Sequence, residues 1–162
     1  MSIQTIQADY KNAQHASDIV TLLNHYACDP MGGGQGLDAF VKNNLIAEMQ
    51  NRPFLFSILA YVDSQAVGLA NCIESFSTFK SKAVVNIHDM VVHPDFRAQG
   101  VSQAVLSAIE ARAHEIDACK ITLEVLSGNK AARGAYEKFG FEGYVLDPDM
   151  GEALFWEKPI EE

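Results

Sequence analysis

The chain has 162 residues, 48% of them hydrophobic, and a formal net charge of -9 at pH 7. This length suits one domain with a sizeable core, so we expect a single domain over residues 1–162. The acidic balance argues against nucleic acid as a partner, and no apolar run approaches a membrane span. The first ten residues lack the basic and apolar regions of a signal peptide, which predicts a cytoplasmic protein with no membrane partner.

The cysteines and histidines show no spacing typical of a metal site. Cys28, Cys72 and Cys119 are an odd number and lie far apart, so they do not suggest a disulfide pair either. We therefore expect reduced thiols and no bound metal.

Hydrophobic periodicity and turn residues predict the order β-α-α-β-β-β-α-β-α-β-β. The expected elements are a strand at 3–8, helices at 16–27 and 37–49, strands at 54–62, 66–78 and 82–92, a helix at 101–115, a strand at 120–126, a helix at 129–139, and closing strands at 141–146 and 153–156. This order predicts an α/β (α+β) fold, in which a mixed central sheet of about seven strands is flanked by about four helices.

The stretch from Val91 to Ser102, VVHPDFRAQGVS, joins an expected strand to an expected helix. A helix start has unpartnered backbone N–H groups and the positive end of the helix dipole, so it suits an anion. Gly100 allows close backbone approach, and Arg97 adds a positive charge. The stretch indicates a pyrophosphate site, and an ordinary turn is the alternative. It matches neither the nucleotide P-loop nor the dinucleotide fingerprint.

A second stretch at 123–141, LEVLSGNKAARGAYEKFGF, strengthens this interpretation. Together the two stretches resemble the GNAT superfamily of acetyl-CoA-dependent N-acetyltransferases. The family pattern V-x-P-x-x-R-x-x-G-x-G/A is matched by Val92, Pro94, Arg97, Gly100 and, in place of the last Gly or Ala, Ser102. The pattern N-x-x-A-x-x-x-Y-x-x-x-G-F is matched by Asn129, Ala132, Tyr136, Gly140 and Phe141.

The resemblance implies one GNAT-type domain that uses acetyl-CoA as cosubstrate. In this fold the strand that ends at Val92 and the strand that begins near Lys120 run parallel and splay apart, and the pantetheine arm enters the gap. The implied cofactor-binding residues are Met90, Val91, Val92, Arg97, Ala98, Gln99, Gly100, Val101, Ser102, Asn129, Ala132 and Tyr136.

Three residues of the final helix lie on one face, at positions i, i+3 and i+7. The resemblance implies that Asn129 holds the cofactor arm, that Ala132 leaves room for it, and that the Tyr136 hydroxyl reaches the sulfur. A tyrosine is a suitable acid for a departing thiolate. The alternative for Tyr136 is a core aromatic residue.

The two-residue period of strand 82–92 predicts two opposite faces: Val84, Asn86, His88 and Met90 on one, and Val85, Ile87, Asp89 and Val91 on the other. In the diamine acetyltransferases, a GNAT branch that this segment resembles, the position of His88 carries a glutamate that helps to remove the amine proton. Histidine can do this work near neutral pH, so His88 is the candidate base. The alternative is a hydrogen-bonded strand residue. We expect Asp89 to be structural.

The segment at 30–36, PMGGGQG, lies between the two early helices, and in the GNAT fold this connection helps to form the acceptor side. The expected acceptor-binding residues are Met31, Gly32, Gly33, Glu74 and Asn86. Alkyl amines are mostly cationic at pH 7, so an acidic protein attracts them. We therefore expect direct acetyl transfer to a small cationic primary amine. The alternatives are a GNAT-fold acetyl-CoA sensor and, for assembly, a monomer or a homodimer.

Overall fold

The computed structural model describes residues 2–160. Its main elements, in chain order, are β1 (Gln4–Gln7), α1 (Ala13–Cys28), α2 (Ala39–Gln50), β2 (Leu55–Val62), β3 (Gln65–Ser77), β4 (Lys82–Val92), α3 (Val101–Glu115), β5 (Lys120–Leu123) and α4 (Lys130–Phe139). Three short 3-10 turns, η1 (Pro30–Gly32), η2 (Pro94–Phe96) and η3 (Pro148–Met150), interrupt the connections.

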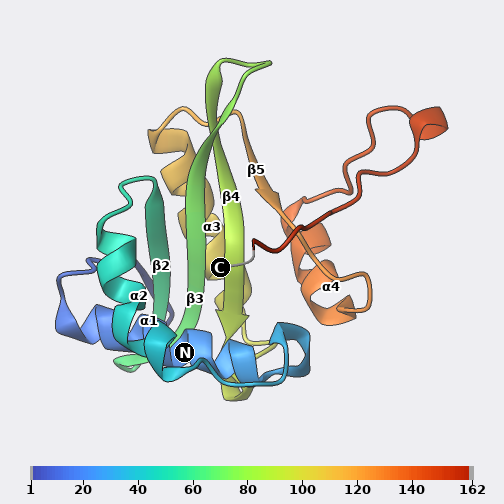
Figure 1. The fold of residues 1–162 in the computed structure, drawn as a ribbon. Coiled ribbons are helices and arrows are strands. Elements are labelled where there is room, and N and C mark those ends of the chain that lie inside the picture. Colours follow the sequence, from blue (N-terminus) through green and yellow to red (C-terminus); the bar gives the residue numbers. More distant parts are fainter. Residues whose placement is uncertain (1, 161–162) are drawn as a thin grey trace.

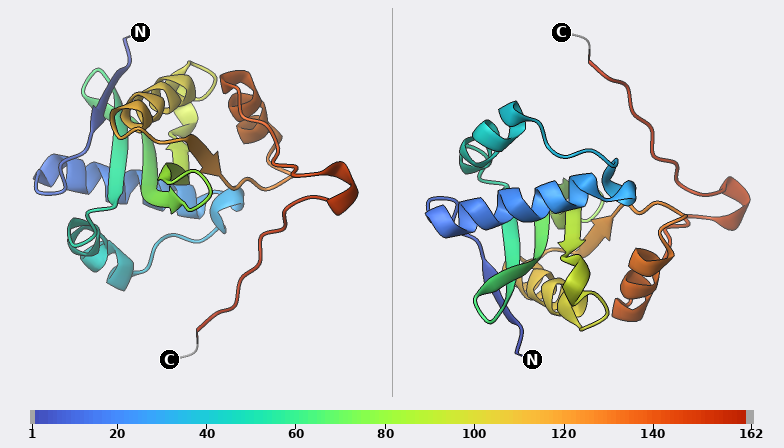
Figure 2. Two further views of the ribbon diagram at one scale, coloured as in Figure 1. Left: turned by 90° about the horizontal axis from the view of Figure 1, so that it is seen from above. Right: turned by 90° about the horizontal axis from the view of Figure 1, so that it is seen from below.

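The strands form one sheet in the order β1-β2-β3-β4-β5. Neighbouring strands from β1 to β4 are antiparallel, whereas β4 and β5 are parallel and are joined through α3. Helices α1 and α2 cover one face of the sheet, and α3 covers the other (Figures 1 and 2). The chain therefore forms the mixed α/β fold that the order of elements predicts, with helices on both faces.

Each face of the sheet has its own apolar core. On one face, α1 and α2 contribute Ile19, Leu22 and Met49, which pack with Leu59 and Leu69. On the other face, α3 packs over the sheet through Val101, Val105, Leu106 and Ile109. These side chains recur at helical spacing, which explains why the periodicity of the sequence predicted the helices.

Capping side chains define where several helices begin. The Asn12 side chain accepts from the N–H groups of Gln14 and His15 at the start of α1, and Asp38 accepts from Val41 at the start of α2. Gly140 ends α4 with a φ of 107°, a left-handed conformation that glycine adopts readily.

A β-bulge interrupts β4, so its side chains do not alternate along the whole strand as predicted. Asn71 of β3 pairs with Asp89 and Cys72 pairs with Ile87, so His88 is an extra residue on β4. Ile87 and Met90 consequently contact the same core beneath α3, although strict alternation placed them on opposite faces. The prediction is therefore wrong beyond His88.

The predicted sheet of about seven strands is also wrong, because the sheet has five. Residues 141–160 contain η3 but no strand, so the closing strands expected at 141–146 and 153–156 are absent from this structure. The segment instead extends away from the body (Figure 1). Its residue types favour strands, but a strand also needs a neighbouring strand to bond with. The strand expected at 120–126 ends earlier, at Leu123.

The fit of α3 against the sheet generates a stability prediction. A Cβ atom at Gly68 would lie 2.7 Å from Cγ1 of the buried Val101, whereas one at Gly134, within α4, would meet nothing within 4 Å. Gly68→Ala should therefore lower the free energy of unfolding by about 1–3 kcal/mol, as overpacking does. Gly134→Ala should raise it by up to about 1 kcal/mol, because alanine favours helix. Urea unfolding checks both, and an unchanged Gly68→Ala protein would contradict the packing described here.

Candidate active site

A cavity of about 400 Å³ opens where the end of β4 meets α3, α4 and the end of α1. Its lining combines residues from all of these elements: Tyr26, Asp29, Met31, Met90, Val91, Val92, Phe96, Arg97, Ala98, Val101, Ser102, Asn129, Ala131, Ala132, Ala135 and Tyr136. The two conspicuous stretches of the sequence, 91–102 and 123–141, thus border one cavity.

The cavity exists because β4 and β5 part. Their parallel register runs from the pair Val84–Lys120 to the pair Ile87–Leu123, after which β5 ends while β4 continues to Val92. Figure 1 shows the chain after β5 leading away from β4 toward α4. The last five residues of β4 therefore present an edge that β5 does not cover, which is the splay that the family resemblance implied.

Asn86 joins the two strands just before they part. Its Nδ2 donates to Oγ1 of Thr122 at 3.1 Å and to the Thr122 carbonyl at 3.4 Å. This side chain does not line the cavity. These hydrogen bonds give Asn86 a structural role at the fork, and the acceptor-binding role expected from the sequence stays a prediction.

The start of α3 has the geometry of an anion site. Gly100 precedes the helix with a φ of 89°, and Ala98 has a φ of 60°, so the chain turns sharply into the first turn of α3. Among the residues that the structure describes, no side chain caps this helix start. The N–H groups of the first turn are thus available to an anion, at the positive end of the helix dipole.

Arg97 is held at the mouth of the cavity. Its Nη2 lies 3.0 Å from Oδ2 of Asp29, and its Nε donates to the Val92 carbonyl at 3.3 Å. The backbone N–H of Met31 and then the Arg97 guanidinium hold the pKa of the Asp29 carboxyl below its usual value. Asp29 also accepts the Met31 N–H at the start of η1, so one carboxylate connects the arginine to the glycine-rich segment.

Helix α4 forms the opposite wall. The Asn129 side chain accepts the Ala132 N–H at 3.1 Å and so caps the helix. Gln103 of α3 donates to the Ala135 carbonyl at 2.9 Å, which fixes α4 beside α3. The Tyr136 ring packs edge-on against Phe141, with ring centroids 5.8 Å apart.

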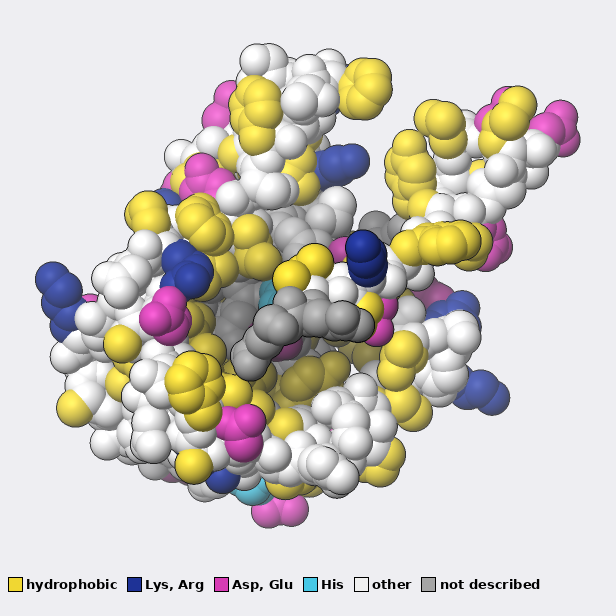
Figure 3. Space-filling model, in the orientation of Figure 1, with side chains coloured by type: hydrophobic (Ala, Val, Ile, Leu, Met, Phe, Trp, Pro, Cys, Tyr) yellow, Lys and Arg dark blue, Asp and Glu magenta, His cyan; other side chains and the backbone are white. Residues whose placement is uncertain are grey.

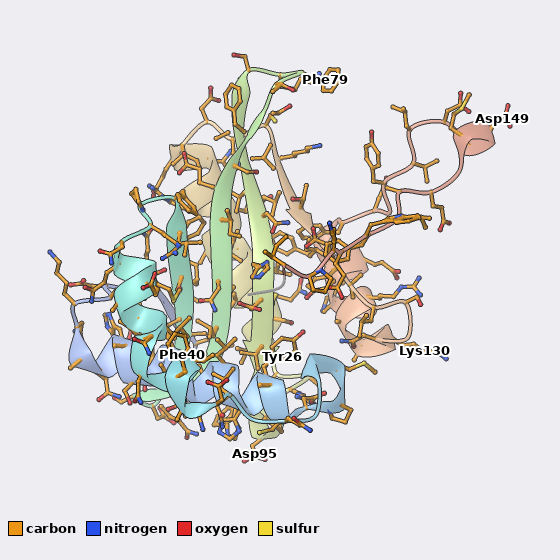
Figure 4. All side chains as sticks on the ribbon, in the orientation of Figure 1. Tyr26, Phe40, Phe79, Asp95, Lys130 and Asp149 are labelled. Carbon is orange, nitrogen blue, oxygen red and sulfur yellow. The ribbon has the colours of Figure 1, made fainter. Side chains whose placement is uncertain are left out.

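Two tyrosines face this cavity. Burial, and then the nearby Tyr26, raise the pKa of Tyr136 above its ordinary value. Burial also raises the pKa of Tyr26, and the charges of Asp89 and Asp29 raise it further. Both hydroxyls therefore stay protonated at neutral pH and can donate a proton or a hydrogen bond. Figure 4 shows Tyr26 near the end of β4.

A series of hydrogen-bonded polar side chains leads from Tyr10 to Asp89. The Tyr10 hydroxyl and Ser57 Oγ are 3.0 Å apart, Ser57 Oγ donates to Asn71 Oδ1 at 2.7 Å, and Asn71 Nδ2 donates to Asp89 Oδ2 at 3.0 Å. Ser57 and Asn71 are buried, so these bonds satisfy groups that would otherwise be costly to bury. Asp89 thus has the structural partner that we expected.

The cavity includes many of the predicted site residues but not all. Its lining contains ten of the twelve cofactor candidates, and Gln99 and Gly100 are outside it. Of the acceptor candidates only Met31 lines it, and Glu74 is exposed on β3. His88 is also exposed and outside the lining.

Five lining residues were not predicted as site residues: Tyr26, Asp29, Phe96, Ala131 and Ala135. Tyr26 and Asp29 come from the end of α1 and the turn after it, directly before the glycine-rich segment. Their place in the sequence next to that segment could draw attention to them, but it does not show that their side chains reach the cavity.

Residues 2–160 contain no cluster of three or more His, Cys, Asp or Glu residues arranged to hold a metal ion. None of their helices combines the length and apolar character needed to cross a membrane.

Comparison with known proteins agrees with this geometry. An uncharacterized N-acetyltransferase, YhfO of Bacillus subtilis (strain 168), is 29% identical over 108 residues, which are 67% of this chain and 69% of YhfO. The crystal structure of a probable acetyltransferase superposes with a TM-score of 0.79 at 20% identity, covering 98% of this chain and 99% of the other.

The aminoglycoside N-acetyltransferase AAC(6')-Iy, in a complex with CoA, gives a TM-score of 0.74 at 17% identity and covers 98% of this chain and 96% of its own. At these identities the structures show a shared fold. The model of the acetyltransferase (GNAT) family matches residues 20–141, which include both stretches that border the cavity. The chain therefore belongs to the GNAT family of acetyltransferases.

Proposed function

We propose that the protein transfers the acetyl group of acetyl-CoA directly to a small cationic primary amine, within a ternary complex. The observation that carries this proposal is the cavity at the fork of β4 and β5, whose lining includes both the first residues of α3, where no side-chain cap bonds the helix start, and Tyr136 of α4. A long donor with a pyrophosphate and a thioester matches both features.

The residues of the cavity fit acetyl-CoA as donor. The N–H groups at the start of α3, together with Arg97, would hold the pyrophosphate. The arm would lie along the open edge of β4, from Met90 to Val92, opposite Ala132 of α4. Small side chains line this wall, including Ala131 and Ala135, and they leave room for the arm.

The proton transfers need an acid and a base. Tyr136 would donate its proton to the departing thiolate; its raised pKa keeps the hydroxyl protonated at neutral pH, so that the proton is in place when the thioester bond breaks. We propose His88 as the group that takes the amine proton. Its place at the bulge, on the part of β4 that β5 leaves uncovered, supports this role. A backbone N–H of residues 90–92 would stabilise the negative charge that develops on the acetyl oxygen.

The proposal of a small cationic amine rests on charge. The chain is acidic overall, with a net charge of -9, and Asp29 and Asp89 lie close enough to Tyr26 to affect its pKa. An amine in this region would be attracted as a cation and must then lose a proton to react. Aminoglycosides, the substrates named for one structural neighbour, are also amines of this kind.

An assay of CoA release over a panel of polyamines, aminoglycosides, amino acids and peptides tests the function. We expect turnover with a polycationic small amine and a KM for that amine that rises with added salt, because salt screens its attraction to the protein. Binding of acetyl-CoA in parallel, with no turnover on any amine, would instead favour a cofactor sensor.

Tyr136→Phe tests the leaving-group role. The change keeps the ring that packs on Phe141 and removes only the hydroxyl. We expect kcat to fall by about ten- to a thousandfold while acetyl-CoA affinity and thermal stability stay close to wild type. Tyr61→Phe is a matched control. It removes a hydroxyl that donates a hydrogen bond to Asp18, and Tyr61 does not line the cavity, so kcat should stay unchanged. Wild-type turnover in Tyr136→Phe would make Tyr136 a packing residue only.

A further inference from the structure

Asp29 holds the first turn of the glycine-rich segment, residues 30–36. Its Oδ1 accepts the Met31 N–H at 2.9 Å, and its backbone carbonyl accepts the N–H groups of Gly32 and Gly34 at 2.8 and 3.1 Å. An aspartate that bonds the backbone two residues on is a common way to fix a turn. The segment therefore occupies one carboxylate oxygen, Oδ1, and leaves Oδ2 to other partners.

The end of α1 keeps Asp29 at the wall of the cavity. The Asp29 N–H donates to the Tyr26 carbonyl at 2.9 Å. A Cβ atom at Gly32 would clash with the same carbonyl oxygen, so the segment packs against the backbone of α1 as only glycine allows. Asp29 and Tyr26 both line the cavity. The carboxylate is thus held beside the cavity by contacts that do not involve Oδ2.

The partner of Oδ2 is Arg97, whose Nη2 lies 3.0 Å away. The side chains of Asp29 and Arg97 are 25% and 53% exposed and both residues line the cavity, so a ligand there can reach either of them. An exposed ion pair contributes little stability, and a pyrophosphate offers the guanidinium more oxygens and more charge than one carboxylate does. Donor binding would therefore take Arg97 from Asp29 and leave the carboxylate without a cation.

The proposed acceptor can supply a new cation. The chain has a net charge of -9, and acidic side chains are distributed over the face drawn in Figure 3, so a polycationic amine is attracted. The group that Asp29 holds cannot be the reacting nitrogen. A carboxylate beside an ammonium group favours its charged form, whereas the reacting nitrogen must lose its proton. Asp29 also contacts the arginine proposed for the pyrophosphate, whereas the proposed place of the thioester is beside Tyr136.

We propose that Asp29 exchanges partners between the two substrates. It pairs with Arg97 in the empty protein and, once the donor's pyrophosphate holds Arg97, it binds a second, non-reacting ammonium group of the acceptor. This inference rests on the proposed acetyl transfer and narrows its acceptors to amines with two or more cationic groups. Donor and acceptor then favour each other's binding, because each ligand takes one member of the ion pair and releases the other.

Calorimetric titration with CoA tests the donor side of the exchange. Asp29→Asn keeps an oxygen that can accept the Met31 N–H and removes the charge that faces Arg97. We expect this variant to bind CoA about two- to fivefold more tightly than the wild type, the range for loss of one competing exposed ion pair. The same change made in Arg97→Ala should have no effect. The matched control is Asp95→Asn, since the Asp95 carboxylate faces His93 and not Arg97, and its affinity should stay at the wild-type value.

Titration with spermidine, a small trication, tests the acceptor side. Saturating CoA should lower the dissociation constant of spermidine for the wild type and for Asp95→Asn at least about fivefold, the lower end of typical coupling between two sites. This tightening should largely disappear in Asp29→Asn. Direct attraction between spermidine and the phosphates of CoA needs no Asp29, so it would persist in that variant. Far-UV circular dichroism verifies that each variant is folded.

Two sets of results would overturn the proposal. The donor side is wrong if CoA affinity is unchanged in Asp29→Asn or rises equally in Asp95→Asn. The acceptor side is wrong if spermidine does not bind the CoA complex, or if CoA tightens its binding equally in Asp29→Asn. Neither titration depends on turnover. An absence of CoA release with every amine would refute the proposed acetyl transfer, and the CoA affinities of the variants would still decide whether Asp29 competes for Arg97.

Discussion

The structure depends on the point at which β4 and β5 stop pairing. Up to the pair Ile87–Leu123 the two strands share a parallel ladder, and Asn86 reinforces it through Thr122. Beyond this pair β4 continues alone to Val92. The uncovered edge of β4, the start of α3 and the face of α4 consequently meet around one cavity, and nearly every residue with a proposed chemical role borders it.

A single ion pair connects the two ends of this site. Arg97 belongs to the turn before α3, and Asp29 belongs to the turn that leads into the glycine-rich segment. An anion that binds at α3 would compete with Asp29 for the guanidinium. If the donor binds there, its binding and the position of η1, on the proposed acceptor side, would be linked through the Asp29 carboxylate.

Much of the fold could be predicted because local signals and tertiary packing agree. Apolar residues at helical spacing, such as Val105 and Ile109, indicated α3, and both side chains are buried between the helix and the sheet. The bulge at His88 could not be predicted, because it arises from the register between β3 and β4, which no local pattern records. The prediction of closing strands at 141–146 and 153–156 was wrong for a related reason. Residues such as Phe155 and Trp156 have strand propensity, but a strand forms only where a partner edge is available.

The candidate site could also be predicted only in part, because some of its residues have a local sequence signal and others are brought to it by tertiary packing. Sequence patterns identify residues that a motif requires for one property: the positive φ of Gly100 at the start of α3, or the positive charge of Arg97. They do not identify residues that reach the cavity from a distant element, such as Tyr26 and Asp29, because these depend on how α1 packs across the sheet. The acceptor role of Glu74, expected because it is a polar residue in an apolar strand, stays a prediction, since Glu74 is exposed and does not line the cavity.

Calorimetric titration with acetyl-CoA tests the central claim most directly, namely that the α3 start and Arg97 hold the donor's pyrophosphate. Arg97→Ala should weaken binding by about 1–3 kcal/mol, the usual effect of losing a charge-assisted hydrogen bond. Arg52→Ala removes a surface arginine paired with Glu48, away from the cavity, and should leave binding unchanged. Equal affinity of wild type and a folded Arg97→Ala protein would contradict the account.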